Sequence, residues 1–348
     1  MTFNVVFMPG TAKRLLPFSL SLLQSPGIRV RLVANACEPG ERELLRSAAD
    51  LDDRLCEHVL PGRHPIEHGE ALNHLFQSHP EPHFAFIDSD VIASGDFMAS
   101  LWPLGPGRAA VFAASAVWMT DEEGIGSPRI SVLSAGRRRL HDGTFVGNTY
   151  CAIYDRAAVE PAWRAAPRGF AVQLSRRLPR ELKASLAARG WSFRAYDTAR
   201  LINLQLLLAG FELDDRRVPE LHHVGGVSIR SFEGSRGAVR RLAALHSSLR
   251  GRTRRVSDAV LTRLYFRLQH DRARERSRRR RGTVLVYLDE VLDAILAAEP
   301  APPAPQTDSP EVDRRLAERV AALEDQYPRG VASLERASGP TDRGVSST

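Results

Sequence analysis

The amino-acid sequence predicts an α/β protein built on a mostly parallel sheet with helices on its faces. Through the first 90 residues, apolar segments of strand length alternate with amphipathic segments of helix length. Strands that alternate with helices pair in parallel, because right-handed crossovers return the chain to the same end of the sheet. With 348 residues, 43% of them hydrophobic, the chain is long enough for one large domain with an appendage.

This first part of the chain is expected to contain four strands and three helices. A turn at 9–11 separates the first strand from the first helix, and the last strand ends in acidic residues. The expected strands are 3–8, 29–34, 54–60 and 83–87, and the expected helices are 15–23, one that opens at 38–41, and 70–77.

The middle of the chain continues the same pattern. Residues 109–117 are typical of a strand, a turn-rich stretch surrounds 121–124, and 145–154 is apolar. A helix is expected from about Thr198 to Ala209, with Asp197 as its N-cap and Gly210 as the residue that ends it.

The C-terminal part is predicted to be a helical extension of an α/β domain over residues 1–232. Apolar residues at helical spacing indicate helices near 239–249, 260–268 and 288–296, within an arginine-rich extension over 233–298. Residues 299–348 are expected to hold a Pro-rich linker at 301–305, a modest helix from Ser309 to Leu323, and a disordered end.

The net charge of +7 is concentrated in one segment. Residues 236–281 contain sixteen arginines against three acidic residues, a surplus of 13 that leaves −6 for the rest of the chain. Such a segment is most often the solvated face of helices, with arginine stems packed over apolar surface. It could also dock on an anionic membrane. Nucleic acid is the least favoured partner, because interleaved aromatic residues and base-reading motifs are missing.

The sequence lacks the features of a membrane, secreted or disulfide-rich protein, and this indicates its cellular compartment. No stretch reaches the roughly 20 apolar residues of a membrane span, and the N-terminus does not read as a secretion signal. A cytoplasmic location is therefore expected, with possible peripheral contact at the inner membrane face. Cys37, Cys56 and Cys151 are odd in number and widely spaced, so neither a disulfide framework nor a zinc site is indicated.

Asp88 and Asp90 are the strongest functional signal in the sequence. They follow an apolar strand, and residues two apart on a strand project to the same side. Two carboxylates placed in this way suit Mg²⁺ or Mn²⁺ carrying a diphosphate. The alternative is that they are solvated turn residues, since acidic side chains often end a strand and cap the next helix.

Five motifs in a fixed order extend this signal over roughly residues 3–230. The motifs are Lys13 and Arg14 followed by Ser21-Leu22-Leu23-Gln24, then Gly69-Glu70-Ala71-Leu72-Asn73, Asp88-Ser89-Asp90, Phe145-Val146-Gly147-Asn148, and His222-His223-Val224-Gly225-Gly226. Together they resemble the GT-A nucleotide-sugar glycosyltransferases, in particular glycosyltransferase family two.

The resemblance implies a GT-A fold and a metal-dependent transfer of sugar from a nucleotide-diphosphate donor to a hydroxyl group, with inversion. The acceptor, whether a saccharide, a lipid-linked molecule or a small molecule, is left open. Implied donor contacts are Pro9, Gly10, Arg14, Asn35, Gly69, Asn73, Asp88 and Ser89; implied metal ligands are Asp88, Asp90, His222 and His223; implied acceptor contacts are Gly147 and Asn148.

Three of these positions carry alternatives. Adjacent histidines on a strand face opposite ways, so only one of the pair is expected in the site, and His222 is slightly favoured over His223. Asp197 is the implied catalytic base, although its N-cap position also explains it. Asn35 stands where the family has an aspartate that binds the base, which leaves UDP, dTDP and GDP donors open.

Two other functions compete with glycosyl transfer. Residues 10–19 partly resemble the opening of the sugar-nucleotide pyrophosphorylases, but Met8-Pro9 replaces glycines that a triphosphate cradle needs. The other candidate is a non-catalytic, arginine-rich binding protein on a degenerate transferase fold, which would not depend on Asp88 or Asp90.

Overall fold

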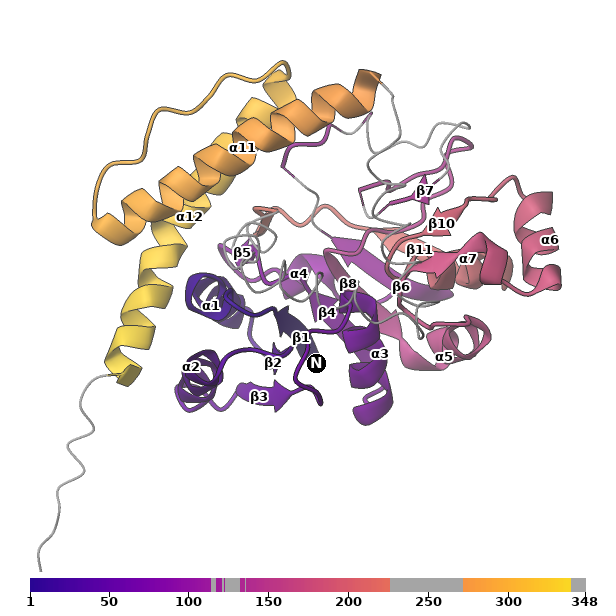
Figure 1. Ribbon diagram of the computed structural model, residues 1–348, viewed down its shortest axis with the longest axis horizontal. Helices are drawn as coiled ribbons and strands as arrows, with labels where there is room; N and C mark the ends of the chain where they lie inside the picture. The colour runs from indigo at the N-terminus through magenta and orange to yellow at the C-terminus, as the bar shows by residue number, and fades with distance from the viewer. Residues whose placement is uncertain (114–116, 121, 123–131, 135, 226–271, 339–348) are drawn as a thin grey trace, which may run out of the picture.

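The structure, a computed structural model, describes residues 1–113, 117–120, 122, 132–134, 136–225 and 272–338. It confirms the expected α/β class. A large, mostly parallel sheet is flanked by helices, and two long helices follow near the C-terminal end (Figure 1). The helices expected at 239–249 and 260–268 lie outside the described residues.

The central sheet has seven strands, and one of them runs against its neighbours. β8 pairs antiparallel with both β4 and β6, whereas β1 pairs in parallel with β2 and β4. The inner strands are mostly apolar because both faces of the sheet are covered, and the buried polar pair Asn4 and Arg31 is hydrogen-bonded at 2.8 Å. The order across the sheet is β11 (Glu212–Asp215), β6 (Arg108–Ala113), β8 (Cys151–Asp155), β4 (His83–Ile87), β1 (Thr2–Phe7), β2 (Arg29–Ala34) and β3 (Leu55–Val59).

Alternate side chains of each strand enter two separate cores. On β4, Ala85 and Ile87 join the core under α1 (Ala12–Ser21) and α2 (Pro39–Ala49), whereas Phe84 and Phe86 join the opposite one. The opposite core lies under α3 (His68–Ser78), α5 (Arg156–Ala165) and α7 (Arg200–Leu208). The remaining short helices are η1 (Leu22–Gln24), α4 (Met98–Leu101), η3 (Ser175–Arg177) and α6 (Arg180–Ala188).

Two small sheets extend this architecture, and the sequence did not indicate either. β5 (Val91–Ala93) pairs antiparallel with β12 (Leu221–His223). β10 (Ala195–Tyr196) pairs with β7 (Val132–Leu133) and β9 (Gln173–Leu174). Strands of two or three residues are too short to show a hydrophobic period, so tertiary pairing alone defines them.

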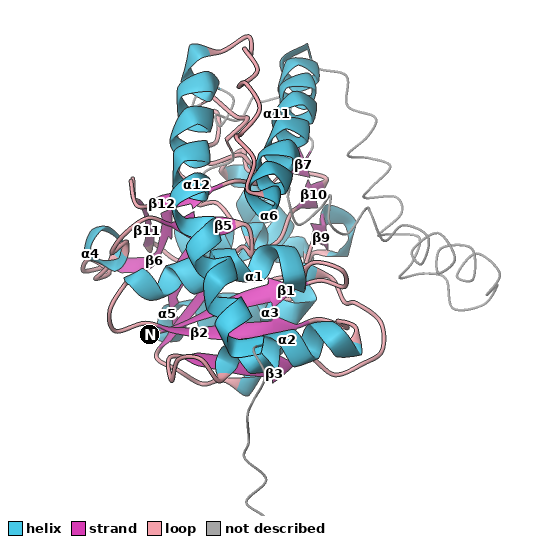
Figure 2. Cartoon of the chain, turned by 90° about the vertical axis from the view of Figure 1, so that its left-hand side faces the viewer, coloured by secondary structure: helices cyan, strands magenta, loops and turns pink. Residues whose placement is uncertain are grey.

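The C-terminal helices are longer than expected. α11 (Arg272–Ala297) and α12 (Pro310–Ser338) lie side by side, and one end of α12 runs along α1 (Figures 1 and 2). The expected end at Leu323 is wrong, because the helix continues through Pro328 to Ser338. Residues 298–309 connect the two helices without helical structure, as the proline run at 301–305 indicates.

Contacts between α12 and α1 explain this length. Tyr327 lies edge-on to Phe18, with ring centroids 5.5 Å apart, and its hydroxyl donates to the Arg14 carbonyl at 3.0 Å. A Cβ at Gly330 would lie 2.8 Å from the Cα of Pro17, so the two helices approach closely there. Buried residues of α11 and α12 belong to the same core as β1, β2 and α1.

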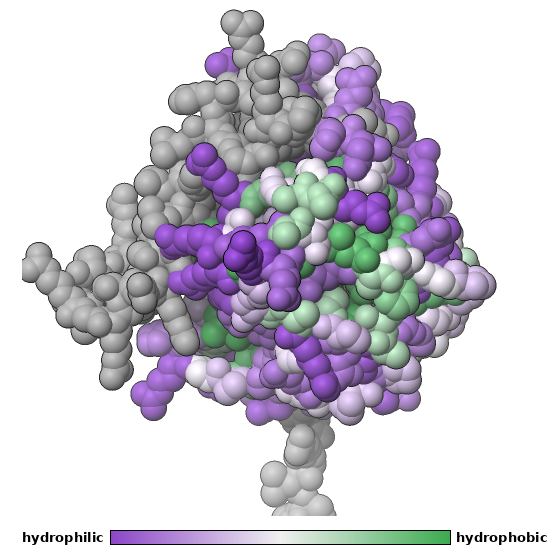
Figure 3. Space-filling model, turned by 90° about the vertical axis from the view of Figure 1, so that its right-hand side faces the viewer, coloured by the Kyte–Doolittle hydropathy of each residue, from purple (hydrophilic) through white to green (hydrophobic). Residues whose placement is uncertain are grey.

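The described surface is polar, with scattered hydrophobic residues. The face at the α6 end is largely hydrophilic, with smaller hydrophobic areas between (Figure 3). No helix in the described ranges combines the length and the hydropathy that crossing a bilayer requires. The large exposed hydrophobic side chains are Leu51, Val59, Phe211, Val286 and Leu296.

Candidate metal centre

Asp88 and Asp90 flank a tight turn between β4 and β5. The backbone N–H of Asp88 donates to the Tyr150 carbonyl at 2.7 Å, and that of Val91 donates to the Asp88 carbonyl at 3.2 Å. The carbonyl of Asp90 accepts from the N–H of Val224, at 3.0 Å. These bonds fix the backbone on both sides of the turn, so both carboxylates are held at the end of an inner strand.

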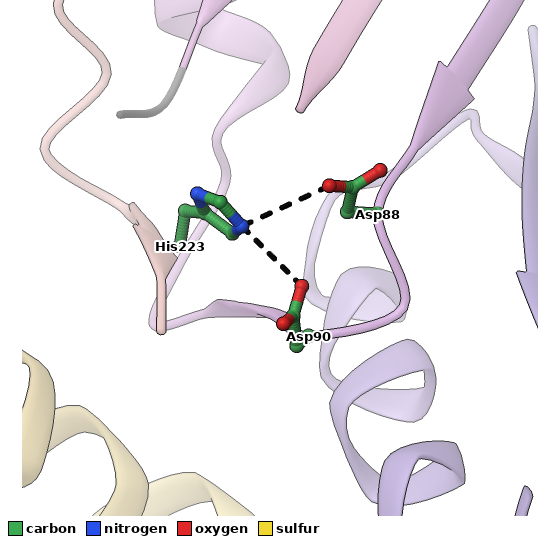
Figure 4. A group of neighbouring side chains, drawn as sticks. All are labelled: Asp88, Asp90 and His223. Atoms are coloured by element: carbon green, nitrogen blue, oxygen red, sulfur yellow. Dashed lines mark ion pairs between the residues drawn. The ribbon is translucent and has the colours of Figure 1, made fainter. Parts of the chain in front are cut away.

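His223 is brought to the aspartates by the β5–β12 ribbon. In this antiparallel pair, His223 stands opposite Val91, the residue after Asp90. Its Nε2 lies 3.3 Å from Asp90 Oδ1 and 3.8 Å from Asp88 Oδ2 (Figure 4). One ligand atom from each of the three residues can be chosen so that all lie within 4.8 Å of one another.

The chemistry of this cluster fits a divalent cation. Burial, the charge of Asp90 and then that of Asp197 raise the pKa of Asp88 well above its usual value, because nearby negative charges oppose its ionisation. A cation would offset this repulsion. Two carboxylate oxygens and one imidazole nitrogen are ligands that Mn²⁺ and Mg²⁺ accept. The Asp88 side chain is 26% exposed, so the cluster is open on that side.

His222 points away from the cluster. Its Nε2 lies 3.0 Å from the hydroxyl of Ser94, and burial lowers its pKa to about 4. Neighbouring residues on β12 face opposite sides, as expected, but pairing with β5 turns His223 inward. The preference for His222 is therefore reversed by the geometry.

Tyr150 is a site residue that the sequence reasoning missed. Its ring lies against that of His223, with centroids 4.1 Å apart and planes inclined by 34°. Burial, followed by the charge of Asp88, raises the pKa of its hydroxyl. The apolar segment 145–154 was noted, but no spacing marks one aromatic residue in it as a neighbour of a histidine more than 70 positions later.

Asp197 lies near the metal cluster and is not the N-cap of α7. Helix α7 begins at Arg200, and its N-cap is Ala199 in a left-handed conformation with φ of 61°. The N-cap explanation for Asp197 is therefore wrong. Its carboxylate accepts from the N–H of Thr198 at 2.9 Å, and its charge contributes to the raised pKa of Asp88. Gly210, with φ of 87°, follows the end of α7 as expected.

A buried arginine connects Asp197 to the expected acceptor loop. The guanidinium of Arg200 donates to the carbonyls of Val146, at 2.9 Å, and Gly147. Burial lowers its pKa to about 10, and the charge of Asp197 opposes that shift. Gly147 has φ of 75°, and Asn148 accepts from the N–H of Tyr150 at 3.1 Å. The loop and the start of α7 therefore form one unit beside the metal cluster.

Several residues expected to contact the donor also make structural contacts within the protein. The side-chain amide of Asn35 exchanges hydrogen bonds with the backbone of Ile66, at 2.9 and 3.0 Å. Asn73 Oδ1 accepts from Trp163 and from the N–H of Phe170, each at 2.8 Å. A Cβ at Gly69 would lie 2.4 Å from the Cα of Ala171, so this glycine permits close packing.

The loop after β1 is also engaged by protein groups. Glu41 accepts from the N–H of Gly10 and of Ala12, each at 3.0 Å, and forms a capping box at the start of α2. Arg14 pairs with Asp289 and Asp293 of α11. Of the remaining expected donor contacts, Pro9 precedes Gly10 in this loop, and Ser89 is buried between the two aspartates.

Comparison with known proteins gives distant structural similarity only. No protein-family model and no curated protein matched the chain. It is similar to the mannosyltransferase PcManGT from Pyrobaculum calidifontis, solved with GDP-Man and Mn²⁺. The alignment covers 97% of this chain and 73% of that chain at 12% identity, with a TM-score of 0.41.

Two further solved structures show the same level of likeness. A protein described as a glucose-1-phosphate thymidylyltransferase, from Bacillus anthracis, aligns over 66% of this chain and 93% of its own at 14% identity, with a TM-score of 0.38. The galactosyltransferase LgtC aligns over 62% and 72% at 12% identity, with a TM-score of 0.37. At TM-scores this low the similarities carry no functional argument, and function must be inferred from the site itself.

Proposed function

We propose that the protein is a metal-dependent glycosyltransferase that moves a sugar from a nucleoside-diphosphate donor to a hydroxyl group. The observation that carries this proposal is the convergence of Asp88, Asp90 and His223, with ligand atoms within 4.8 Å of one another. The carboxylates follow an inner strand of a mostly parallel sheet, at the edge where such sheets bind ligands. Mn²⁺ or Mg²⁺ is the proposed ion.

The three ligands would play unequal parts. Asp90 and His223 are each 2% exposed at the side chain, so they form the closed side of the site. Asp88, at 26%, faces the open side where a diphosphate would arrive. A bound divalent ion would neutralise the negative charge that develops on the leaving diphosphate. The Tyr150 ring packs against the His223 ring, with the two planes inclined by 34°.

Asp197 is the proposed general base. Its carboxylate is partly exposed and lies close enough to Asp88 for their charges to interact. It would take the proton of the acceptor hydroxyl as that oxygen attacks the sugar. One base and a departing diphosphate on opposite sides of the sugar suit a single displacement, which inverts the anomeric carbon.

The geometry of the loop after β1 speaks against the pyrophosphorylase alternative. Such an enzyme would need backbone N–H groups in this loop for a triphosphate. Here Glu41 occupies the N–H groups of Gly10 and Ala12 with its own negative charge. Contact with an anionic membrane remains a prediction, because residues 226–271 of the basic segment lie outside the described ranges.

The test measures Mn²⁺ binding by calorimetry and thermal shift, then turnover. Asp88→Asn and Asp90→Asn are expected to weaken Mn²⁺ binding by more than about a hundredfold and to abolish turnover, because each removes a charged ligand. Asp50→Asn is the matched control, since Asp50 is exposed at the end of α2. Unchanged Mn²⁺ binding and turnover in both site variants would contradict the proposal.

A screen of nucleoside diphosphates and their sugars, with and without Mn²⁺, identifies the donor through the rise in melting temperature on binding. Proton NMR of the product then reads the anomeric configuration directly. Retention of configuration would overturn the single displacement and the role of Asp197. Release of pyrophosphate from a nucleoside triphosphate and a sugar 1-phosphate would instead establish a nucleotidyltransferase.

A further inference from the structure

Three arginines of the C-terminal helices donate to backbone carbonyls around the metal cluster. Arg280 of α11 reaches the Trp118 carbonyl at 3.2 Å. Arg315 and Arg319, one turn apart on α12, reach the carbonyls of Met119 at 2.8 Å and His223 at 3.0 Å. Two helices remote in sequence therefore hold both the segment at Trp118 and Met119 and the end of β12, which carries the ligand residue His223.

Arg319 makes the contact nearest to the metal cluster. It is 6% exposed, and its Nε donates to the carbonyl of the ligand residue His223 itself. Its Nη1 donates to the Arg315 carbonyl within α12, at 3.0 Å. The guanidinium is thus braced against its own helix while it holds the β12 strand, and its planar fork fixes the direction of both bonds.

Among the described residues, a short strand and contacts of the two residues that follow it also restrain the backbone at His223. β12 is only three residues long and ends at His223. Beyond it, Val224 bonds to the Asp90 carbonyl, and Gly225 adopts φ of 76° against the ring of Trp118. The backbone of His223 is held by β5 on one side and by Arg319 on the other, and its imidazole packs against the Tyr150 ring. Because a side chain follows the orientation of its backbone, Arg319 contributes to the direction of the imidazole.

We propose that Arg319 is a positioning residue that sets the His223 imidazole for metal binding, so that the affinity of the site for metal depends on helix α12. This inference rests on the proposed function, because it assigns His223 to a metal. A group that hydrogen-bonds to a ligand residue, and so fixes its orientation, typically changes metal affinity by about 10- to 100-fold.

A double-mutant cycle separates this role from a merely structural one. Arg319→Met is expected to weaken Mn²⁺ binding about tenfold in the full-length chain. In the His223→Ala background, where only the two carboxylates remain, Arg319→Met should change the Mn²⁺ dissociation constant by less than about twofold, because Arg319 acts through the imidazole. Mn²⁺ binding is measured by electron paramagnetic resonance, and folding by circular dichroism.

Arg329→Met is the matched control on the same helix. Arg329 is exposed and pairs with Asp325 one turn away, without touching the loops of the site. It should leave Mn²⁺ affinity unchanged. Arg319→Lys keeps one charged donor, so its affinity for Mn²⁺ is expected to lie between those of the parent and Arg319→Met. If Arg319→Met does not fold, the cycle is run with the lysine variant.

The outcomes distinguish the two proposals. If the parent chain binds no Mn²⁺, the proposed function fails. If the parent binds Mn²⁺ and Arg319→Met binds it equally well, or loses as much affinity with His223 present as with His223 absent, the positioning role is overturned.

Discussion

Asp88 and Asp90 are two residues apart yet lie in different environments. Asp90 is closed in by the Val224 N–H at its carbonyl and by His223 at its carboxylate. Asp88 has a quarter of its side chain exposed, while burial and neighbouring charge raise its pKa. A carboxylate whose ionisation is opposed by burial and by neighbouring negative charge, and which has an open face, is well placed to share a cation with an arriving ligand.

The sequence could predict the aspartate pair but not the histidine. The period of two along a strand places Asp88 and Asp90 on one side whatever the rest of the fold does. Which of His222 and His223 faces them depends on the register of β12 against β5, and two three-residue strands give no periodic signal. The engagement of Asn35 by Ile66 is likewise a tertiary contact that a motif cannot show.

His58 is expected to make the stability of the folded protein depend on pH. It faces His74 and His79, with ring centroids 5.7 and 4.9 Å away. Burial, and then the charges of His79, His74 and Arg31, lower the pKa of His58 from 6.5 to about 4. The unfolded chain therefore takes up a proton at higher pH than the folded chain, and the free energy of unfolding falls as pH drops from 6.5 towards 4.

The measurement is urea unfolding at several pH values in that window. In His58→Gln, the decrease in the free energy of unfolding between pH 6.5 and pH 4 should be smaller than in the parent by roughly 1 kcal/mol. This figure is reduced for solvent screening, because the site is half-buried. His141→Gln, at an exposed position, is the control and should keep the parent profile. A His58→Gln profile that parallels the parent would contradict this account.

Elements of the fold differ in how far local sequence determines them. β2 begins and ends at the residues expected from its apolar run, and α7 ends before Gly210 as its sequence indicates. The start of α7 moves past Asp197, because the chain makes a left-handed turn at Ala199 before the helix begins. The full length of α12 was not predictable either, since its second half is stabilised by α1 rather than by its own pattern.

One glycine in each of the two C-terminal helices provides a matched test of the packing of α12 on α1. Gly330→Ala should destabilise the protein by about 1–3 kcal/mol, because the added Cβ would lie 2.8 Å from Pro17. Gly282→Ala, in α11, meets nothing within 4 Å and should stabilise by about 0.5–1 kcal/mol through helix propensity alone. Chemical denaturation measures both, and equal effects from the two alanines would show that α12 does not pack on α1 in this way.

At the scale of the whole molecule, the C-terminal helices are part of the main core. Leu288 and Leu292 of α11 and Leu316 and Leu323 of α12 are at most 1% exposed and belong to the core that contains β1 and α1. The sequence indicated a helical extension because its composition changes at the arginine-rich segment. Amino-acid composition gives the charge of a segment, however, and does not show which neighbouring element covers its apolar face.

A single unfolding transition is therefore expected. All four tryptophans lie within the first 191 residues, so their fluorescence reports mainly the α/β part, although Trp118 also contacts α11. Circular dichroism at helical wavelengths reports α11 and α12 as well. The two signals should change at the same temperature because one core spans both parts. Circular dichroism that falls well before fluorescence would show that the helices unfold independently.

The contact of Tyr327 with Phe18 and Arg14 has a consequence for biosynthesis. A nascent chain that has left the ribosome as far as His223 already carries every ligand of the proposed metal site. Until α12 has followed, however, the outer face of α1 is bare and the carbonyl of His223 lacks Arg319. Full metal affinity and completion of the core are thus expected only after α12 has emerged, and a stalled chain would expose the apolar face of α1 to chaperones.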